Sequence, residues 1–249
     1  MSGHSKWAQI KRQKGVTDSR RGQLFTKLGR EITIAARQGG GDPDANFRLR
    51  LAVQRARDAN MPSDTIDRAV KRGSGDSDAA DLQEITYEGY GPGGTAILVD
   101  VLTDNRNRTA AELRATFTRA GGSLGEPGSV AWQFESRGVI TVNANGAEAE
   151  TVELAAIDAG AEDVKSEDGV VEIITGASDL EAVRRALVDN NLPVASAEPS
   201  MIAKTTVDLG DHEAEQVLRL LDRLEELDDV QQVHSNAEFS DAVLAGLQE

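Results

Sequence analysis

Residues 85–102 read ITYEGYGPGGTAILVDVL, and this stretch decides the fold class. Two runs rich in β-branched and aromatic residues, Ile85–Tyr90 and Thr95–Leu102, flank a segment of glycine and proline, which is the pattern of a β-hairpin. Gly89–Gly94 also has the G-x-G-x-x-G spacing of dinucleotide-binding loops. Such a loop must lead from a strand into a helix, whereas this one leads into a second strand. We therefore predict a glycine-rich hairpin loop and no dinucleotide site.

A second motif, DNRNRT, follows the hairpin at residues 104–109. Its threonine and Glu112 have capping-box spacing, so a helix is expected to begin directly after the motif. Arg106 and Arg108 would then lie just ahead of the helix N-terminus, where free backbone N–H groups favour an anion. Two interpretations stay open, because these arginines either bind a phosphate group or pair with the plentiful carboxylates of the surrounding chain.

Beyond this motif, strand-like and helix-like segments alternate to the end of the sequence. Short strands with helices between them predict an α+β class, in which helices cover one face of antiparallel sheets. We predict two ferredoxin-like α/β sandwich domains, one inserted in the other. Residues 136–204 form the inserted domain, and residues 79–135 together with 205–249 form the discontinuous one.

The first 75 residues differ from the rest in both pattern and charge. Helical periodicity covers about Asp18–Gln38, about Asp44–Ala59 and a short third segment between Pro62 and Gly73. Residues 1–75 hold 16 Lys and Arg against 7 Asp and Glu, a net charge of +9, whereas the remaining residues carry −24. Such charge asymmetry indicates a nucleic-acid-binding region at the basic end. We therefore predict a basic three-helix nucleic-acid-binding domain over residues 1–75.

The second helix of this region carries arginines at seven-residue spacing. Arg48 and Arg55 form one pair and Arg50 and Arg57 the other, so each pair lies on one side of the helix. Few acidic residues lie nearby in the sequence, and we interpret these arginines as uncompensated cations that contact phosphates. The full set of candidate nucleic-acid-binding residues is His4, Lys6, Trp7, Lys11, Arg12, Lys14, Arg20, Lys27, Arg30, Arg37, Arg48, Arg50, Arg55, Arg57, Arg106 and Arg108.

Composition argues against several other classes of protein. The chain has 249 residues, no cysteine and three histidines that share no ligand-spaced cluster. The lack of cysteine excludes a disulfide framework, a thiolate metal site and a cysteine nucleophile, and it fits a reducing cytoplasm. No apolar run approaches the ~18 residues of a membrane span, and the first residues lack a signal-peptide pattern. We expect a cytoplasmic protein with no membrane association, no cofactor and no bound metal.

No catalytic motif stands out either. The sequence contains no Walker-type loop, nucleophile elbow or H-E-x-x-H motif. We therefore expect no enzymatic activity, and a metal-dependent nuclease is kept only as a distant alternative.

Several long motifs, in the right order, resemble the YebC/PmpR family. They include GHSKW at residues 3–7, YEGYGPGGT at 87–95, TDNRNRT at 103–109 and GGSLG at 121–125. The resemblance implies a three-domain α+β protein with a helical first domain. Members of this family are usually described as DNA-binding transcriptional regulators, whereas related proteins, including a mitochondrial translational activator, act on the ribosome. A DNA-binding transcriptional regulator is the leading hypothesis, and an RNA- or ribosome-binding translation factor is its alternative.

Overall fold

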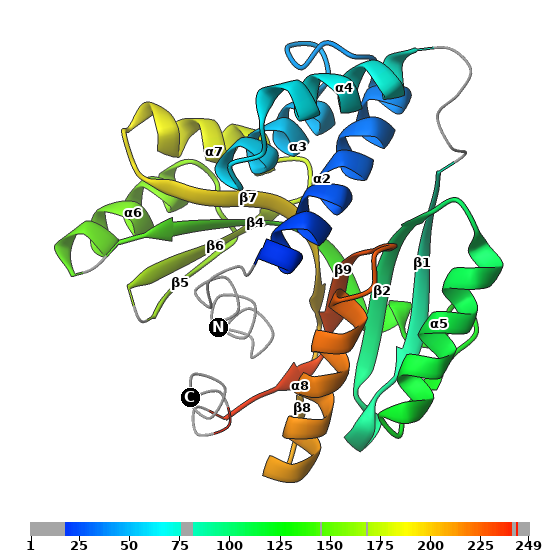
Figure 1. The fold of residues 1–249 in the computed structure, drawn as a ribbon. Coiled ribbons are helices and arrows are strands. Elements are labelled where there is room, and N and C mark those ends of the chain that lie inside the picture. The colour runs from blue at the N-terminus through cyan, green and yellow to red at the C-terminus, as the bar shows by residue number, and fades with distance from the viewer. Residues whose placement is uncertain (1–17, 76–81, 145, 168, 241–242, 244–249) are drawn as a thin grey trace.

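The computed structural model describes residues 18–75, 82–144, 146–167, 169–240 and 243. Within these ranges the chain forms a helical bundle and two four-stranded antiparallel sheets, each covered by helices (Figure 1). The α+β class predicted from the sequence is confirmed. Six candidate residues lie outside the described part of the chain, as does the side chain of Arg20; they are His4, Lys6, Trp7, Lys11, Arg12 and Lys14.

The bundle consists of three helices, α2 (Asp18–Gly39), α3 (Phe47–Asp58) and α4 (Ser63–Ser74). These helices pack around a core built entirely from residues of the bundle itself. Helix α3 begins where it does because the Asn46 side chain accepts a hydrogen bond from the backbone N–H of Leu49. All three helices were predicted, with bounds close to those observed.

Helices α2 and α4 approach each other closely at Gly73. A Cβ atom at this position would lie 2.2 Å from the backbone carbonyl oxygen of Thr33 and 2.7 Å from the Cβ of Ala36. The sequence analysis placed Gly73 beyond the end of the third helix, but α4 continues through it to Ser74. This glycine therefore provides room for the neighbouring helix and does not terminate its own.

The first sheet contains, in spatial order, β3 (Ser123–Leu124), β1 (Gln83–Tyr90), β2 (Ala96–Thr103) and β9 (Val230–Ser235). Its central pair is the predicted hairpin, in which Tyr90 pairs with Ala96 across a 3₁₀ turn at Pro92–Gly94. The loop does lead into a second strand, as expected. A short parallel pair, β8 (Val207–Asp208) and β10 (Ala237–Glu238), lies outside this sheet.

Helices α5 (Arg106–Arg119) and α8 (Asp211–Glu225) cover one face of the first sheet and share its apolar core. Helix α5 begins earlier than predicted, because the Asn105 side chain accepts a hydrogen bond from the backbone N–H of Arg108. The expected cap, Thr109, is buried instead. Arg106 and Arg108 thus lie in the first turn of the helix and not ahead of it.

The second sheet lies between β3 and β8 in the chain. It contains, in spatial order, β5 (Asp163–Glu167), β6 (Val170–Gly176), β4 (Phe134–Asn143) and β7 (Val194–Ala203). With helices α6 (Ala147–Asp158) and α7 (Leu180–Asp189), the chain order β4-α6-β5-β6-α7-β7 is that of a ferredoxin-like sandwich. Its first and last strands are neighbours, and Phe134 pairs with Ala203.

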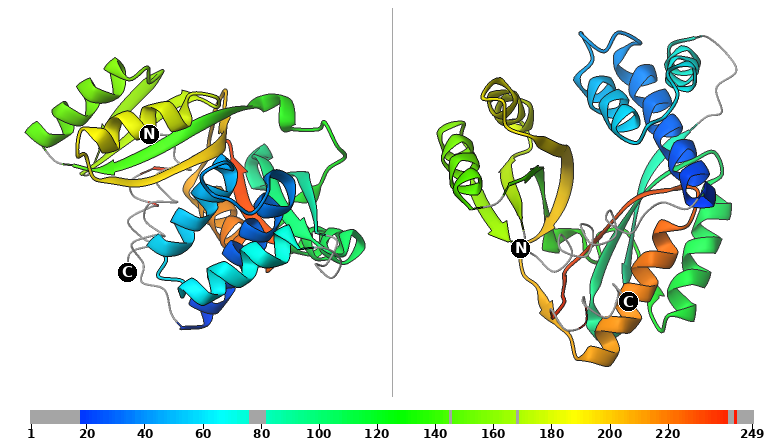
Figure 2. Two further views of the ribbon diagram at one scale, coloured as in Figure 1. Left: turned by 90° about the horizontal axis from the view of Figure 1, so that it is seen from above. Right: turned by 60° about the vertical axis from the view of Figure 1, so that its left-hand side comes forward.

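The two sheets join through a small apolar cluster in which Leu98 and Phe134 pack near Met201. The bundle lies against both sheets (Figures 1 and 2). Only Leu51 of the bundle contributes to the apolar core of the second sheet in the described residues. The surface between the bundle and the sheets is therefore mainly polar, as in an interface between domains that can separate.

Candidate nucleic-acid interface

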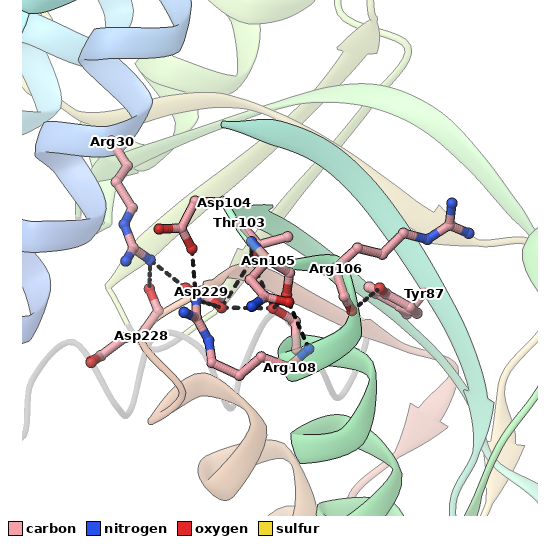
Figure 3. Close-up of polar contacts among 10 residues, drawn as sticks. Arg30, Tyr87, Thr103, Asp104, Asn105, Arg106, Arg108, Asp228 and Asp229 are labelled. Carbon is pink, nitrogen blue, oxygen red and sulfur yellow. Dashed lines mark hydrogen bonds and ion pairs between the residues drawn. The ribbon is translucent and has the colours of Figure 1, made fainter. Parts of the chain in front are cut away.

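Two basic residues of α2 bind the C-terminal end of α8. The Lys27 ammonium group donates a hydrogen bond to the carbonyl oxygen of Glu225. The Arg30 guanidinium group donates to the carbonyl oxygen of Asp228 and to the carboxylate of Asp229, both at 2.7 Å (Figure 3). The last carbonyl groups of a helix carry partial negative charge, so cations are favoured there. Lys27 and Arg30 therefore fasten the bundle to the first sheet.

Asp229 is the centre of this contact. Its carboxylate, 4% exposed, accepts hydrogen bonds from Arg108 at 2.8 Å, from Thr109 at 2.7 Å and from Thr103 at 3.1 Å, in addition to that from Arg30. Burial alone would raise the pKa of Asp229, but these hydrogen bonds and the positive charge of Arg30 outweigh it and lower the pKa. The ionised carboxylate thus joins α2, α5 and β2 at one point.

The two arginines of the DNRNRT motif have different environments. Arg108 is paired with Asp229 and also with Asp104, at 2.9 Å. The side chain of Arg106 is exposed and points away from Asp229 (Figure 3), and within the described ranges it has no acidic partner. The backbone carbonyl of Arg106 accepts a hydrogen bond from the Tyr87 hydroxyl. Of the two interpretations left open, carboxylate pairing therefore describes Arg108.

Two arginines of α3 reach acidic residues outside the bundle. Arg48 forms an ion pair with Glu84 of β1 and donates a hydrogen bond to the Gln38 side chain at 2.5 Å. The hydrogen bond from Arg48 lowers the pKa of Glu84. Arg50 lies 3.5 Å from Glu181 in the first turn of α7. These contacts connect α3 to both sheets.

Three further candidate arginines of the bundle have different environments. Arg55 lies between Glu31 of α2, at 2.9 Å, and Glu198 of β7, at 3.3 Å. Arg57 is exposed on α3 without an acidic partner in the part of the chain that the structure describes. Arg37 is exposed in the last turn of α2.

The sequence analysis treated the α3 arginines as uncompensated because it considered only acidic residues nearby in the sequence. Three of them are compensated by glutamates from distant segments of the chain. We use the term bundle ion pairs for four ion pairs that, among the described residues, join the bundle to the rest of the molecule: Arg30–Asp229, Arg48–Glu84, Arg50–Glu181 and Arg55–Glu198.

Other cations of the bundle face solvent. We call them the outer cations: Arg21, Arg57, Arg68, Lys71 and Arg72. None has an acidic partner among the residues described, and Arg68 donates hydrogen bonds only within its own helix. Apart from Arg57, the sequence analysis did not select them. For the outer cations on α4, the sequence feature that could have identified them is their position away from the apolar face of the helix, which contains Ile66 and Ala69.

Within the described ranges, no three His, Asp or Glu side chains lie together so that they could hold a metal ion. In the same ranges, no helix is long and apolar enough to cross a membrane.

Comparison with known proteins matches both parts of this architecture. Residues 5–76 match the model of the TACO1/YebC protein N-terminal domain, and residues 82–237 match that of the TACO1/YebC second and third domain. The chain belongs to the TACO1/YebC family. The resemblance inferred from the sequence motifs is confirmed, and the family models divide the chain at the end of the helical bundle.

Relatives in this family are similar along almost their whole length. A probable transcriptional regulatory protein from Roseiflexus castenholzii is 60% identical, covering 96% of each chain. Another with the same description, from Dehalococcoides mccartyi, is 53% identical over 98% of this chain and 97% of the relative. The crystal structure of a conserved hypothetical protein from Aquifex aeolicus, 44% identical, superposes with a TM-score of 0.85 over 90% of this chain and 93% of that one. The Aquifex aeolicus protein therefore shares this arrangement of bundle and sheets.

Proposed function

We propose that this chain is a nucleic-acid-binding regulator of gene expression, acting as a DNA-binding transcriptional regulator in the cytoplasm without a cofactor or a catalytic step. Relatives described as probable transcriptional regulatory proteins, at 53% to 60% identity over nearly the whole chain, support the regulatory role. Their descriptions favour transcription over translation.

The observation that carries nucleic-acid binding is the position of the positive charge. The bundle keeps the outer cations exposed, although acidic residues outnumber basic ones in the rest of the chain by 24. A polyphosphate is repelled by the acidic sheets and attracted to the bundle. In this proposal residues 1–75 form the binding domain, while residues 79–135 with 205–249 and residues 136–204 form the two acidic sandwich domains.

The candidate residues have two roles in this proposal. Those engaged with carboxylates or carbonyl groups hold the molecule together: Lys27, Arg30, Arg48, Arg50, Arg55 and Arg108. The others contact nucleic acid together with the outer cations, of which Arg57 is one: His4, Lys6, Trp7, Lys11, Arg12, Lys14, Arg20 and Arg106. Arg37, which is exposed in the last turn of α2, also contacts nucleic acid in this proposal.

A charge-matched pair of variants tests the location of binding. The first replaces Arg57, Arg68, Lys71 and Arg72 by Gln, and the second replaces Arg137, Arg185, Arg219 and Arg223 by Gln. Both remove four positive charges, but only the first removes them from the bundle. We expect the first variant alone to bind duplex DNA more weakly, with a log–log salt slope reduced by about one unit per lost phosphate contact. An equal loss of affinity for duplex DNA in both variants would contradict the proposal.

Crosslinking in cells, followed by sequencing of both the bound DNA and the bound RNA, distinguishes the leading function from its alternative. Enrichment of discrete DNA sites is expected for a transcriptional regulator. Recovery of ribosomal or messenger RNA without DNA enrichment would instead identify a translation factor.

A further inference from the structure

The outer face of α5 carries a shallow, open hollow of about 460 Å³. It is lined by Arg114 and Arg119 and by three residues with small side chains, Ala111, Ala115 and Thr118, which we call its floor. Five residues of helix correspond to about 140° of rotation, which places the two arginines on opposite sides of the small residues. Neither arginine has an acidic partner in the described part of the chain.

Helix α6 has the complementary features on its outer face. Leu154 and Ile157 are 66% and 58% exposed, although they are large and apolar. Glu150 and Asp158 are both exposed, and they lie four residues before and four residues after Leu154. Residues four apart are neighbours on a helix surface, so a carboxylate lies on each side of the leucine along the helix axis. Among the described residues, no ion pair engages either carboxylate.

These two faces cannot meet within one molecule. Helix α6 lies at one end of the structure and α5 at the other, with the bundle and both sheets between them (Figures 1 and 2). We propose that α6 of one copy docks on α5 of a second copy, with Leu154 and Ile157 against the small-residue floor and Glu150 and Asp158 paired with Arg114 and Arg119.

A second copy of the chain explains both faces at once. A nucleic acid on α5 would engage the arginines, but it would leave the exposed leucine and isoleucine of α6 without a partner. Adjacent apolar side chains surrounded by polar residues are typical of protein–protein contact sites. The carboxylates of α6 would also repel a phosphate backbone and attract the arginines of α5.

The expected contact is small and unsymmetrical. One helix packed on another buries less than the ~800 Å² per partner of a standard interface, so association should be weak and concentration-dependent. Two different faces meet, which makes the contact heterologous and lets it repeat from copy to copy unless the assembly closes.

Sedimentation velocity of the full-length chain, over a range of concentrations and without nucleic acid, tests this contact. One variant combines Arg114→Glu with Arg119→Glu, and a second combines Glu150→Arg with Asp158→Arg. Each variant gives α5 and α6 the same sign of charge, so each alone should remain monomeric where the unmodified chain associates. An equimolar mixture should associate again, because every docking then joins an acidic face to a basic one.

The control variant combines Arg219→Glu with Arg223→Glu on α8, which makes the same charge change as the α5 variant away from both faces. It should associate like the unmodified chain, and circular dichroism should show all variants folded. Both docking variants keep a net negative charge, so general attraction cannot produce the recovery in the mixture. A chain that is monomeric at every concentration overturns the proposal, as does association that no variant changes. Weaker nucleic-acid binding by the α5 variant without any change in sedimentation would also overturn it.

Discussion

Arg55 of α3 lies 3.3 Å from Glu198 of β7, so an arginine expected to bind phosphate instead ties the helical bundle to the second sheet. Arg30, Arg48 and Arg50 make equivalent contacts with Asp229, Glu84 and Glu181. Because these pairs are partly exposed and the apolar contact across the same surface is small, the position of the bundle should depend on ionic conditions.

If the bundle ion pairs hold the bundle in place, reversing the charge of the acidic partner in two of them should displace the bundle measurably. Combining Glu84→Lys with Glu198→Lys places like charges opposite Arg48 and Arg55, so the bundle should move away from the sheets. The chain contains no cysteine, so dyes attached at Asp67→Cys on α4 and Asp189→Cys on α7 report this distance by energy transfer. Transfer efficiency should fall in the variant, and it should also fall when salt is added to the unmodified chain.

The control for this experiment combines Glu112→Lys with Glu148→Lys, which makes the same charge change on α5 and α6. Transfer efficiency in the control should equal that of the unmodified chain. If reversal of Glu84 and Glu198 has no larger effect, the ion pairs do not hold the bundle in place.

The basic and acidic parts of the chain should differ sharply in their affinity for nucleic acid. A fragment of residues 1–75 contains the complete core of the bundle and should fold, which circular dichroism can confirm. It should bind duplex DNA more tightly than the full chain, because its arginines are freed from competing carboxylates and the acidic residues are gone. A fragment of residues 76–249 should bind weakly. Gel-shift titrations of the three proteins at one salt concentration measure this, and equal affinities of the two fragments would refute the charge argument.

The depressed pKa of Asp229 predicts a pH dependence of stability. A carboxyl group whose pKa is lower when folded contributes stability that is fully present above its unfolded pKa of about 3.9. That contribution is lost as the pH falls through the lower folded value. Asp229→Asn should cost about 1.5–3 kcal/mol at neutral pH, because it removes the charge-assisted hydrogen bonds that Arg30 and Arg108 donate to this carboxylate.

Thermal unfolding of both proteins between neutral pH and pH 2 measures this effect. The difference in stability between the unmodified chain and Asp229→Asn should shrink as the pH falls below 4. A difference that stays constant across this range would show that the charge of Asp229 is not what stabilises the site.

The approach of α4 to α2 predicts opposite effects for two glycine substitutions. Gly73→Ala forces a Cβ against the Thr33 carbonyl oxygen and should destabilise the chain by about 1–3 kcal/mol. Gly22→Ala is the matched control, because a Cβ on that α2 residue would meet nothing within 4 Å. It should stabilise the chain by about 0.5–1 kcal/mol through the helix propensity of alanine. Melting temperatures test both, and a neutral Gly73→Ala would mean that the two helices separate at little cost.

Local features of the fold could be predicted from the sequence because their causes lie within a few residues. The hairpin at Tyr90–Ala96 follows from glycine and proline between β-branched runs. Helical periodicity and the glycines after α2 likewise located α2 and α3, although α3 begins later than predicted because Asn46 caps it. The start of α5 was predicted wrongly because two capping residues competed. Asn105 caps the helix, while the hydroxyl of Thr109 is directed to Asp229.

The state of the candidate site depends on contacts that no local pattern encodes. Arg48 and Arg57 look alike in the sequence, yet Arg48 is paired with Glu84 whereas Arg57 has no acidic partner among the described residues. The partner of Arg50, Glu181, belongs to a helix of the second sheet and reaches α3 only after the whole chain has folded. Charge totals therefore located the basic region, but they could not separate its structural cations from its free ones.

The pairing of Phe134 with Ala203 brings the entry and the exit of the second sheet side by side. The six elements of this sheet and its helices therefore begin and end at adjacent points, so the chain before β4 and the chain after β7 could be joined there by a tight turn. Under the proposed division into domains, this arrangement lets residues 136–204 fold as a unit between two adjacent points of the other domain.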